Sequence, residues 1–524
     1  MIGAGRAPCD DGVVLAAPAR IACDERQRRA ALVATVLGSS VAFLDGSMVN
    51  VALPAIQRSF AAALPDVQWV FNAYLLSLAA LILAGGALGD RYGRRRVFVV
   101  GLGLFAAASL AAALAPEIRT LQLARAAQGV GGALLVPNSL ALLAASHPPE
   151  LRGRAIGSWA AATAVTAALG APLGGALVDL VSWRPVFLLT PPVAFAAAAI
   201  ALVGVPADRP DGPRHLDLAG AALSTAALAA LAFGLMQGPP LGWRHPAVVA
   251  ALAAAPLLLA LFAVVERRSA EPLVPAEVVR SPVFRGANLL TLLLYFALSG
   301  TFFFLPFHLI QVQGWSATAA GAAFLPMTLL VGGLSRWSGA LFDRFGARLP
   351  LVVGPLVAAA GFALFAVAGA DASYPTTFLP AMVVLGLGMA VAVAPLTTVV
   401  MEAVPERFAG TASGVNNATS RLASMLAVAV LGAVALVGFR GELGERLAAA
   451  EVEPAVAERL LEESDRLAGL KDELGDIEGR PRVEAAVDEA FVATFRRLMA
   501  VTTLLAVGAA VTGAVGLGGT RERA

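Results

Sequence analysis

The stretch from Gly86 to Arg96 reads GALGDRYGRRR, and it constrains the fold more than any other segment of this chain. It joins two long apolar runs, so that an acidic residue, Asp90, and four arginines stand between them. Clustered arginines beside an apolar run are typical of a short loop where the chain leaves a bilayer and re-enters it. An arginine-rich surface turn is the alternative, but it does not explain the apolar flanks.

A weaker copy of this stretch, GALFDRFGAR, occupies residues 339–348 and also lies between apolar runs. Repetition of one local pattern at a wide separation indicates an internal duplication of the fold. The two copies together therefore predict a chain built from two related halves.

Composition places the chain in a membrane. Apolar residues make up 58% of the 524 residues and charged residues 14%, whereas a soluble chain carries about 25% charged residues. A membrane helix needs about 20 apolar residues, and we place fourteen such spans between residues 30 and 517. Fifteen arginines fall in the short loops on one side and four on the other. This bias predicts a multi-pass protein of the cytoplasmic membrane with both termini in the cytoplasm.

The fourteen spans divide into six, two and six, because the stretch at Gly86 follows the second span and its copy follows the tenth. The expected segments are a disordered cytoplasmic tail (1–29), a six-helix bundle (30–204), linkers with inserted helices 7 and 8 (205–285), a second six-helix bundle (286–517) and a cytoplasmic tail (518–524). The second bundle includes the charged loop 439–490, which we expect to be a solvated helical hairpin outside the cell.

Asp45 and Arg125 are ionisable residues that lie within apolar spans. Asp45 is in the first span, and Arg125 is in the fourth with Gln128 one turn further on the same face. An aspartate in a membrane helix is a functional-site hypothesis by default, and burial disfavours the charged form of a carboxyl group, as a proton-binding site requires. A buried guanidinium needs an acceptor, and Asp45 is the obvious candidate. The alternatives are that Asp45 hydrates at the outer interface and that Arg125 extends to the outer surface.

The fifth span contains glycines around a proline, in the sequence Leu169–Ala176, and we expect bending or close helix contact there. Lys471, the sole lysine, does not follow a glycine, so no phosphate-binding Gly-Lys-Ser/Thr loop exists. The four histidines (147, 215, 245 and 308) are scattered, and we expect His308 at an interface. No cofactor and no metal site are predicted.

The stretch at Gly86 resembles the loop between helices 2 and 3 of the major facilitator superfamily of transporters. Over residues of about 30 to 517, the chain is similar to the fourteen-span drug:proton antiporters of that superfamily. The resemblance implies two six-helix bundles plus two inserted helices. It implies that the loop stabilises the outward-facing state by docking the two bundles, through Gly86, Asp90, Arg91, Gly93 and Arg94. We expect Asp90 to meet the start of span 13 near Gly410.

Other segments carry the same resemblance. Asp45, Asn50 and Pro54 match the pattern of the first helix, and Arg125, Gln128 and Gly129 match an R-x-x-Q-G pattern that is linked to proton transfer. The pattern of the fifth helix, G-P-x-x-G-G, is shifted by one place here, because its proline is the third residue of the segment. That segment comprises Gly170, Pro172, Gly174 and Gly175. The shift weakens the argument for antiport over symport.

From the resemblance we expect a secondary transporter that exports small amphiphilic molecules in exchange for protons, with Asp45 as the coupling carboxylate and Arg125 tuning it. Candidate residues of the substrate cavity are Asn50, Phe296, Phe302, Phe303 and Phe324. The alternatives are an exporter dedicated to one metabolite or self-made antibiotic, a proton symporter for uptake, and a membrane-embedded transferase or sensor on a transporter-like fold. The expected partners are the substrate, protons and the lipid bilayer, with no nucleic acid, and a monomer is one arrangement that the sequence allows.

Overall fold

The computed structural model of the protein describes residues 23–207, 218–269, 276–405, 408–474 and 479–516. Within these ranges every regular element is a helix. Thirteen helices are long and apolar enough to cross a membrane, and α3 (Leu64–Tyr92) is a fourteenth, bent by 51° between Ile82 and Ala84. The bend lies beside the glycine pair at 85 and 86, a usual place for a kink. The predicted all-α fold with fourteen spans is confirmed.

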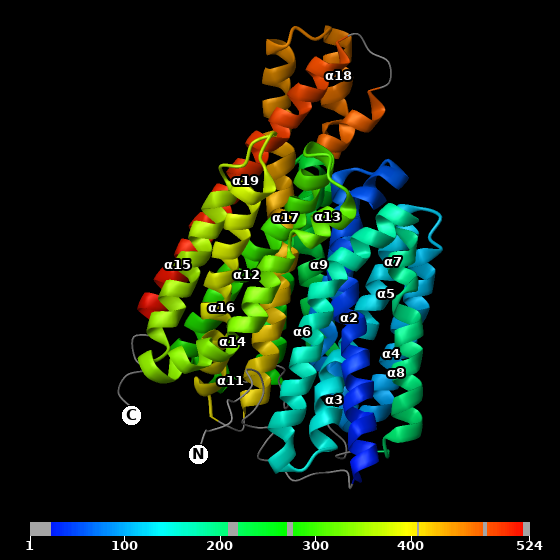
Figure 1. The fold of residues 1–524 in the computed structure, drawn as a ribbon, viewed down its shortest axis with the longest axis vertical. Coiled ribbons are helices and arrows are strands. Elements are labelled where there is room, and N and C mark those ends of the chain that lie inside the picture. Colours follow the sequence, from blue (N-terminus) through cyan, green and yellow to red (C-terminus); the bar gives the residue numbers. More distant parts are fainter. Residues whose placement is uncertain (1–22, 208–217, 270–275, 406–407, 475–478, 517–524) are drawn as a thin grey trace.

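The first bundle is formed by six spans, one of which is α2, the helix that contains Asp45 (Figure 1). Its other members are α3, α4 (Arg94–Ala113), α5 (Ile118–Ala145), α6 (Pro149–Leu180) and the broken span α7 (Arg184–Leu188) with α8 (Thr190–Gly204). Helix α2 (Glu25–Phe60) starts five residues before the expected span, because Asp24 and Gln27 form a capping box at its N-terminus. The tail expected to reach residue 29 is therefore helical from Glu25, and residues 1–22 and 517–524 lie outside the described part.

The second bundle repeats the arrangement of the first. Its members are α12 (Pro282–Phe307) with η1 (His308–Val312), α13 (Ala317–Ala322) with α14 (Leu325–Phe345), α15 (Arg348–Phe365), η2 (Tyr374–Phe378) with α16 (Leu379–Glu402), α17 (Ala409–Ala449) and α19 (Arg480–Gly516). The two inserted spans, α9 (Leu218–Leu241) and α10 (Pro246–Arg268), pack on each other, and α9 also packs against α3 and α17. A short helix, α11 (Ala276–Arg280), precedes α12.

The duplicated loop has the same backbone geometry in both halves. Gly93 ends α3 with φ of 95°, and Gly346 follows α14 with φ of 72°. Only glycine adopts such angles without strain. In both copies the preceding arginine lies over the adjacent aromatic ring, with 5.3 Å between guanidinium carbon and ring centroid for Arg91 and Tyr92 and for Arg344 and Phe345. The duplication inferred from sequence is therefore present in the fold.

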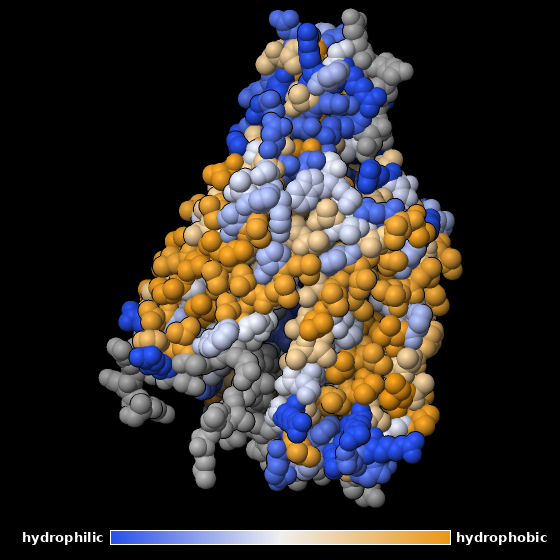
Figure 2. Space-filling view, in the orientation of Figure 1, coloured by the Kyte–Doolittle hydropathy of each residue, from blue (hydrophilic) through white to orange (hydrophobic). Residues whose placement is uncertain are grey.

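An apolar belt surrounds both bundles, and hydrophilic side chains gather at the two ends of the molecule (Figure 2). We call the end where α2 begins and α19 ends the terminal side, and the opposite end the distal side. On the distal side α17 and α19 project beyond the belt and join α18 (Pro454–Glu462) and η4 (Ser464–Glu473), which we call the distal subdomain.

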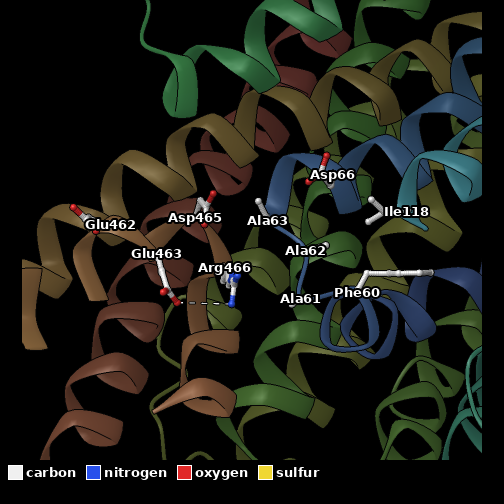
Figure 3. A pocket seen from close by; sticks show the side chains of 10 residues that line it. All are labelled: Phe60, Ala61, Ala62, Ala63, Asp66, Ile118, Glu462, Glu463, Asp465 and Arg466. Carbon is white, nitrogen blue, oxygen red and sulfur yellow. Dashed lines mark ion pairs between the residues drawn. The ribbon is translucent and has the colours of Figure 1, made fainter. Parts of the chain in front are cut away.

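The distal subdomain is more than the solvated hairpin expected for residues 439–490. It has an apolar interior whose leucines are at most 6% exposed, namely Leu443, Leu447, Leu460, Leu467, Leu470 and Leu474. It also rests on the first bundle, where the Gln57 side chain donates a hydrogen bond of 3.3 Å to the Arg466 carbonyl. A pocket of about 390 Å³ lies at this contact, lined by Phe60–Ala63, Asp66 and Ile118 of the first bundle and by acidic residues around Arg466 (Figure 3). Burial is the main cause that raises the pKa of one of these acids, Asp465.

Candidate functional site

A fully buried ion pair lies inside the first bundle. The Arg125 Nη1 atom is 2.5 Å from Asp45 Oδ2, and the two side chains are 1% and 0% exposed. Asp45 therefore does not hydrate at an interface, and Arg125 does not extend to the surface. The sequence predicts Asp45 as the acceptor for Arg125, and the structure confirms this pairing.

Further hydrogen bonds surround this pair. Gln128 donates from Nε2 to Asp45 Oδ1 at 3.1 Å and to Ser109 Oγ at 2.7 Å, and its Oε1 accepts from Arg125 Nη1 at 2.8 Å. The Arg125 Nε atom donates to the Val70 carbonyl at 3.0 Å. The guanidinium also lies over the Tyr74 ring, 4.5 Å from its centroid. A buried charge pair is tolerable only with such additional partners.

Close packing of α5 against its neighbours assembles this cluster. A Cβ atom on Gly129 would lie 2.4 Å from the Tyr74 carbonyl of α3, and one on Gly131 would lie 2.8 Å from the Phe105 nitrogen of α4. Only glycine permits backbones to approach so closely. The approach brings the Val70 carbonyl and Ser109 within reach of the polar face of α5. Gln128, expected as a packing residue, is in addition a ligand of the carboxylate.

The cluster faces the interior of its own bundle. On α2, Asp45 is fully buried, whereas the next residue, Gly46, is partly exposed and has no atom within 4 Å of a hypothetical Cβ. Successive residues point to different sides of a helix. The exposed face of α2, where Gly46 lies, is therefore next to the face that carries the Asp45 carboxylate, but the two faces differ.

The two bundles are in contact on the distal side. Asp179, at the end of α6, accepts hydrogen bonds from the backbone nitrogens of Ala317 and Thr318 at 2.9 and 2.8 Å and from the Thr318 hydroxyl at 2.6 Å. These are the first residues of α13 in the other bundle, and a helix N-terminus favours an anion. The sequence alone indicates no role for Asp179.

Glycines of the fifth span form the same contact. A Cβ on Gly175 would lie 2.2 Å from the Ala317 carbonyl, across the bundle interface. Gly170 and Gly174 instead approach Ser47 and Met48 of α2, within the first bundle. Helix α6 runs without a break through Pro172. Of the two roles expected for this segment, the structure gives it close helix contact.

The predicted cavity residues lie mostly in this closed half. The Asn50 side chain donates a hydrogen bond of 2.8 Å to the Phe302 carbonyl across the bundles. Phe302 and Phe324 pack edge to face with centroids 4.9 Å apart, and fully buried Phe303 packs on Phe71 of α3 at 5.8 Å. Phe296 is half-buried. In this conformation Asn50, Phe302 and Phe303 therefore join the bundles.

Toward the terminal side the bundles diverge (Figure 1), and the space-filling view shows a furrow between them (Figure 2). Hypothetical Cβ atoms on Gly332 and Gly333 of α14 have no neighbour within 4 Å. The burial of α17 also increases from the terminal toward the distal side. Residues 413–422 are half-buried or exposed, whereas most of residues 425–436 are buried. The protein is thus closed on the distal side and open on the terminal side.

The loop Gly86–Arg96 lies on this open side. Asp90 pairs with Arg94 at 2.8 Å, and both side chains are about one-fifth exposed. The tight position is Gly89, where a Cβ would lie 1.6 Å from Asn138 Oδ1, whereas at Gly86 the nearest atom would be 3.7 Å away. The expected contact of Asp90 with the start of span 13 stays a prediction.

Comparison with known proteins identifies the fold's lineage. The sequence model of the Major Facilitator Superfamily matches residues 35–428. The chain belongs to this superfamily. It is 34% identical over 483 residues to the multidrug resistance protein Stp of Mycobacterium tuberculosis, covering 91% of this chain and 90% of that protein. It is 37% identical over 404 residues to the tetracenomycin C resistance and export protein of Streptomyces glaucescens, covering 76% and 74%.

Among solved structures, this protein resembles a bacterial homologue of the human lysosomal transporter Spinster in an inward-facing, unoccupied conformation. The TM-score is 0.68 at 17% identity, over 94% of this chain and 98% of the other. A peptide transporter of the POT family gives a TM-score of 0.60 at 16% identity, over 91% and 99%. At these identities the likeness concerns the fold alone.

Proposed function

We propose that this superfamily member is a secondary transporter that exports small amphiphilic drugs across the cytoplasmic membrane in exchange for protons. Relatives that cover most of the chain are named for resistance to tetracenomycin C, to puromycin and to multiple drugs. A transporter dedicated to one compound is the second candidate, since several relatives are named for a single antibiotic.

The buried pair of Asp45 and Arg125 is the observation that supports proton coupling. Protonation of Asp45 removes the charge that holds the guanidinium, and a buried pair that loses one partner costs about 3–5 kcal/mol. A change of 1.4 kcal/mol shifts an equilibrium tenfold. One proton at Asp45 therefore biases the balance between the two conformations by orders of magnitude if only one of them keeps the pair intact.

The open side and the state of the pair fit an exporter. With the terminal side in the cytoplasm, as the arginine bias predicts, this structure faces inward with Asp45 paired to Arg125. That is the state of an antiporter after its proton has left to the cytoplasm and before substrate enters. In the other conformation Asp45 gains access to the outside and takes up a proton, while Asp90 and its loop dock the bundles on the inner side.

Transport driven by an imposed pH gradient in proteoliposomes tests this function, with a panel of lipophilic cations, neutral drugs and organic acids. The wild-type protein should concentrate at least one class of substrate against its gradient. Asp45→Asn should abolish this uphill transport while allowing downhill exchange of neutral substrates. Asp371→Asn removes an exposed carboxylate from the loop after α15 and serves as the matched control. Uphill transport by Asp45→Asn at the wild-type rate would overturn the assignment.

A further inference from the structure

Arg421 on α17 is another arginine within a membrane span, and its surroundings differ from those of Arg125. Its Nε atom is buried and makes no hydrogen bond, and the side chain as a whole is partly exposed. Among the described residues no carboxylate lies within 4 Å of its guanidinium. Arg125, in contrast, has a carboxylate, an amide and a carbonyl as acceptors.

Arg421 lies where the contact between the bundles ends. One turn further along α17, the Met425 carbonyl accepts a hydrogen bond of 3.4 Å from Asn72 of α3, and one turn beyond that the Val428 carbonyl accepts one of 2.5 Å from Gln68. On the terminal side of Arg421, the partly exposed residues of α17 are largely polar, and they include Ser413, Asn416, Asn417 and Ser420. The arginine therefore stands at the inner end of the furrow between the bundles.

Within the described ranges, the electrostatic surroundings of Arg421 contain two phenols and no carboxylate. The phenols belong to Tyr74 of α3 and to Tyr295 of α12. Tyr74 is buried, with 5% of its surface exposed. Neither phenol is an anion at neutral pH. Asp45 is already neutralised by Arg125. The positive charge of Arg421 is therefore uncompensated in the described part of the site, and a charge at this depth in a membrane normally has a partner or a function.

We propose that Arg421 binds an acidic group of the transported molecule, a carboxylate or an ionised phenol or enol, with Tyr74 and Tyr295 beside it. A guanidinium pairs with a carboxylate through two parallel hydrogen bonds, and the phenol rings provide apolar surface with a hydroxyl that can donate. This inference deepens the proposed function and rests on it, because it names the substrate class as amphiphilic organic acids.

The same tyrosine connects this subsite with the carboxylate cluster. The ring of Tyr74 lies against the Arg125 guanidinium, with 4.5 Å from the guanidinium carbon to the ring centroid. Tyr74 belongs to α3, whose Asn72 side chain donates a hydrogen bond to the Met425 carbonyl one turn along α17 from Arg421. A substrate anion at Arg421 therefore lies beside the helix that packs against the proton-binding pair. The acidic group of the substrate and the proton of Asp45 occupy adjacent but separate sites.

Binding of a matched series of probes tests the proposal without any pH gradient. The probes are pyrenebutyrate, pyrenebutyramide and pyrenebutylamine, which share one apolar scaffold and carry a negative, a neutral and a positive end group. Calorimetry on the purified full-length transporter in uncharged detergent, free of anionic lipid, gives each Kd. We expect the wild type to bind the acid about tenfold or more tightly than the amide.

Arg421→Gln should remove this preference and leave the Kd of the amide within threefold. Arg421→Lys should retain part of it, because the charge remains but the paired hydrogen bonds do not. Arg440→Gln, which changes an exposed arginine on the same helix, is the matched control and should bind as the wild type does. Thermal melting of each variant confirms that it is folded.

Three results would overturn the proposal. The first is a wild type that does not prefer the acid. The second is an Arg421→Gln protein that loses affinity for acid and amide equally, which would make Arg421 a packing residue. The third is an Arg421→Gln protein that keeps the full wild-type preference for the acid over the amide, which would place the acidic group at another site.

These outcomes separate the subsite from proton coupling. If Asp45→Asn keeps the preference for the acid and loses uphill transport, both proposals stand. If the wild type prefers the acid but no pH gradient drives its transport, the proposed function fails and the subsite remains. If transport is pH-driven and Arg421→Gln does not alter the ratio of acid to amide, only the subsite fails.

Discussion

Asp179 at the end of α6 accepts hydrogen bonds from both the backbone nitrogen and the hydroxyl of Thr318, the second residue of α13. This contact joins the two bundles on the distal side at a helix N-terminus, where a negative charge is favoured. The distal side cannot open without breaking it. Asp179 therefore acts as a latch on the conformation described here.

The latch predicts a shift toward the distal-open state in Asp179→Asn. Hydrogen bonds to a charged group contribute about 1.5–3 kcal/mol, so the distal-open population should rise about tenfold or more. Spin labels on cysteines introduced at Leu114 and Val367, exposed ends of the two bundles on this side, report the distance by pulsed electron resonance. Cys9 and Cys23 are first replaced by serine. Thr318→Val, which removes only the hydroxyl, should shift the population less, and an unchanged distance distribution in Asp179→Asn contradicts the latch.

Gly175 tests the closeness of the same contact. Because a Cβ there would lie 2.2 Å from the Ala317 carbonyl, Gly175→Ala should hinder distal closure and slow transport at least tenfold, with a longer distance between the same spin labels. Gly46→Ala places the same methyl group where no atom lies within 4 Å, and it should leave both the rate and the distance unchanged. Equal behaviour of the two variants would mean that the bundles do not meet at Gly175.

Within the loop Gly86–Arg96, the structure distinguishes two glycines. A Cβ on Gly89 would lie 1.6 Å from Asn138 Oδ1, and Asn138 is held by hydrogen bonds of 2.8 Å to the Gly85 carbonyl and 2.7 Å to the Leu134 carbonyl. Overpacking of this kind costs about 1–3 kcal/mol. We expect the melting temperature of Gly89→Ala to lie several degrees below that of the wild type. The melting temperature of Gly86→Ala should equal that of the wild type. In an Asn138→Ala background the effect of Gly89→Ala should shrink, and if it does not, Asn138 is not the obstacle.

The sole lysine gives a direct test of orientation. Lys471 lies in the distal subdomain, pairs with Asp488 at 2.5 Å and remains 19% exposed. A membrane-impermeant amine reagent applied to intact cells should modify Lys471, and Lys471→Arg should remove that modified site. Modification that requires permeabilised cells would place the distal side in the cytoplasm and reverse the proposed topology.

Much of the fold follows from the sequence because a membrane limits the choices. Apolar runs of sufficient length must be helices, and the two copies of the loop at Gly86 and Gly339 fix the division into related halves. The same reasoning paired Asp45 with Arg125, because a buried guanidinium needs an acceptor and few carboxylates lie inside spans.

Other features depend on distances that a sequence does not encode. Nothing in the pattern around Asp179 indicates that the first residues of α13 lie beside it, since 138 positions separate it from Ala317. His308, expected at an interface, is fully buried and stacks on Phe495 with ring centroids 4.7 Å apart. The leucines of the distal subdomain form an interior only because α17 and α19 extend past the apolar belt. Asn50, Phe302 and Phe303 join the bundles here because the conformation is closed on their side.

Proton release on substrate binding shows whether Asp45 carries the proton that is exchanged for substrate. In lightly buffered detergent solution, addition of a transported neutral or cationic drug, which places no negative charge beside Asp45, should release protons that a pH-sensitive dye detects. Asp45→Asn should bind the drug and release none, whereas Asp371→Asn should match the wild type. Release of the same number of protons by Asp45→Asn would contradict the account, because the exchanged proton would then reside on another group.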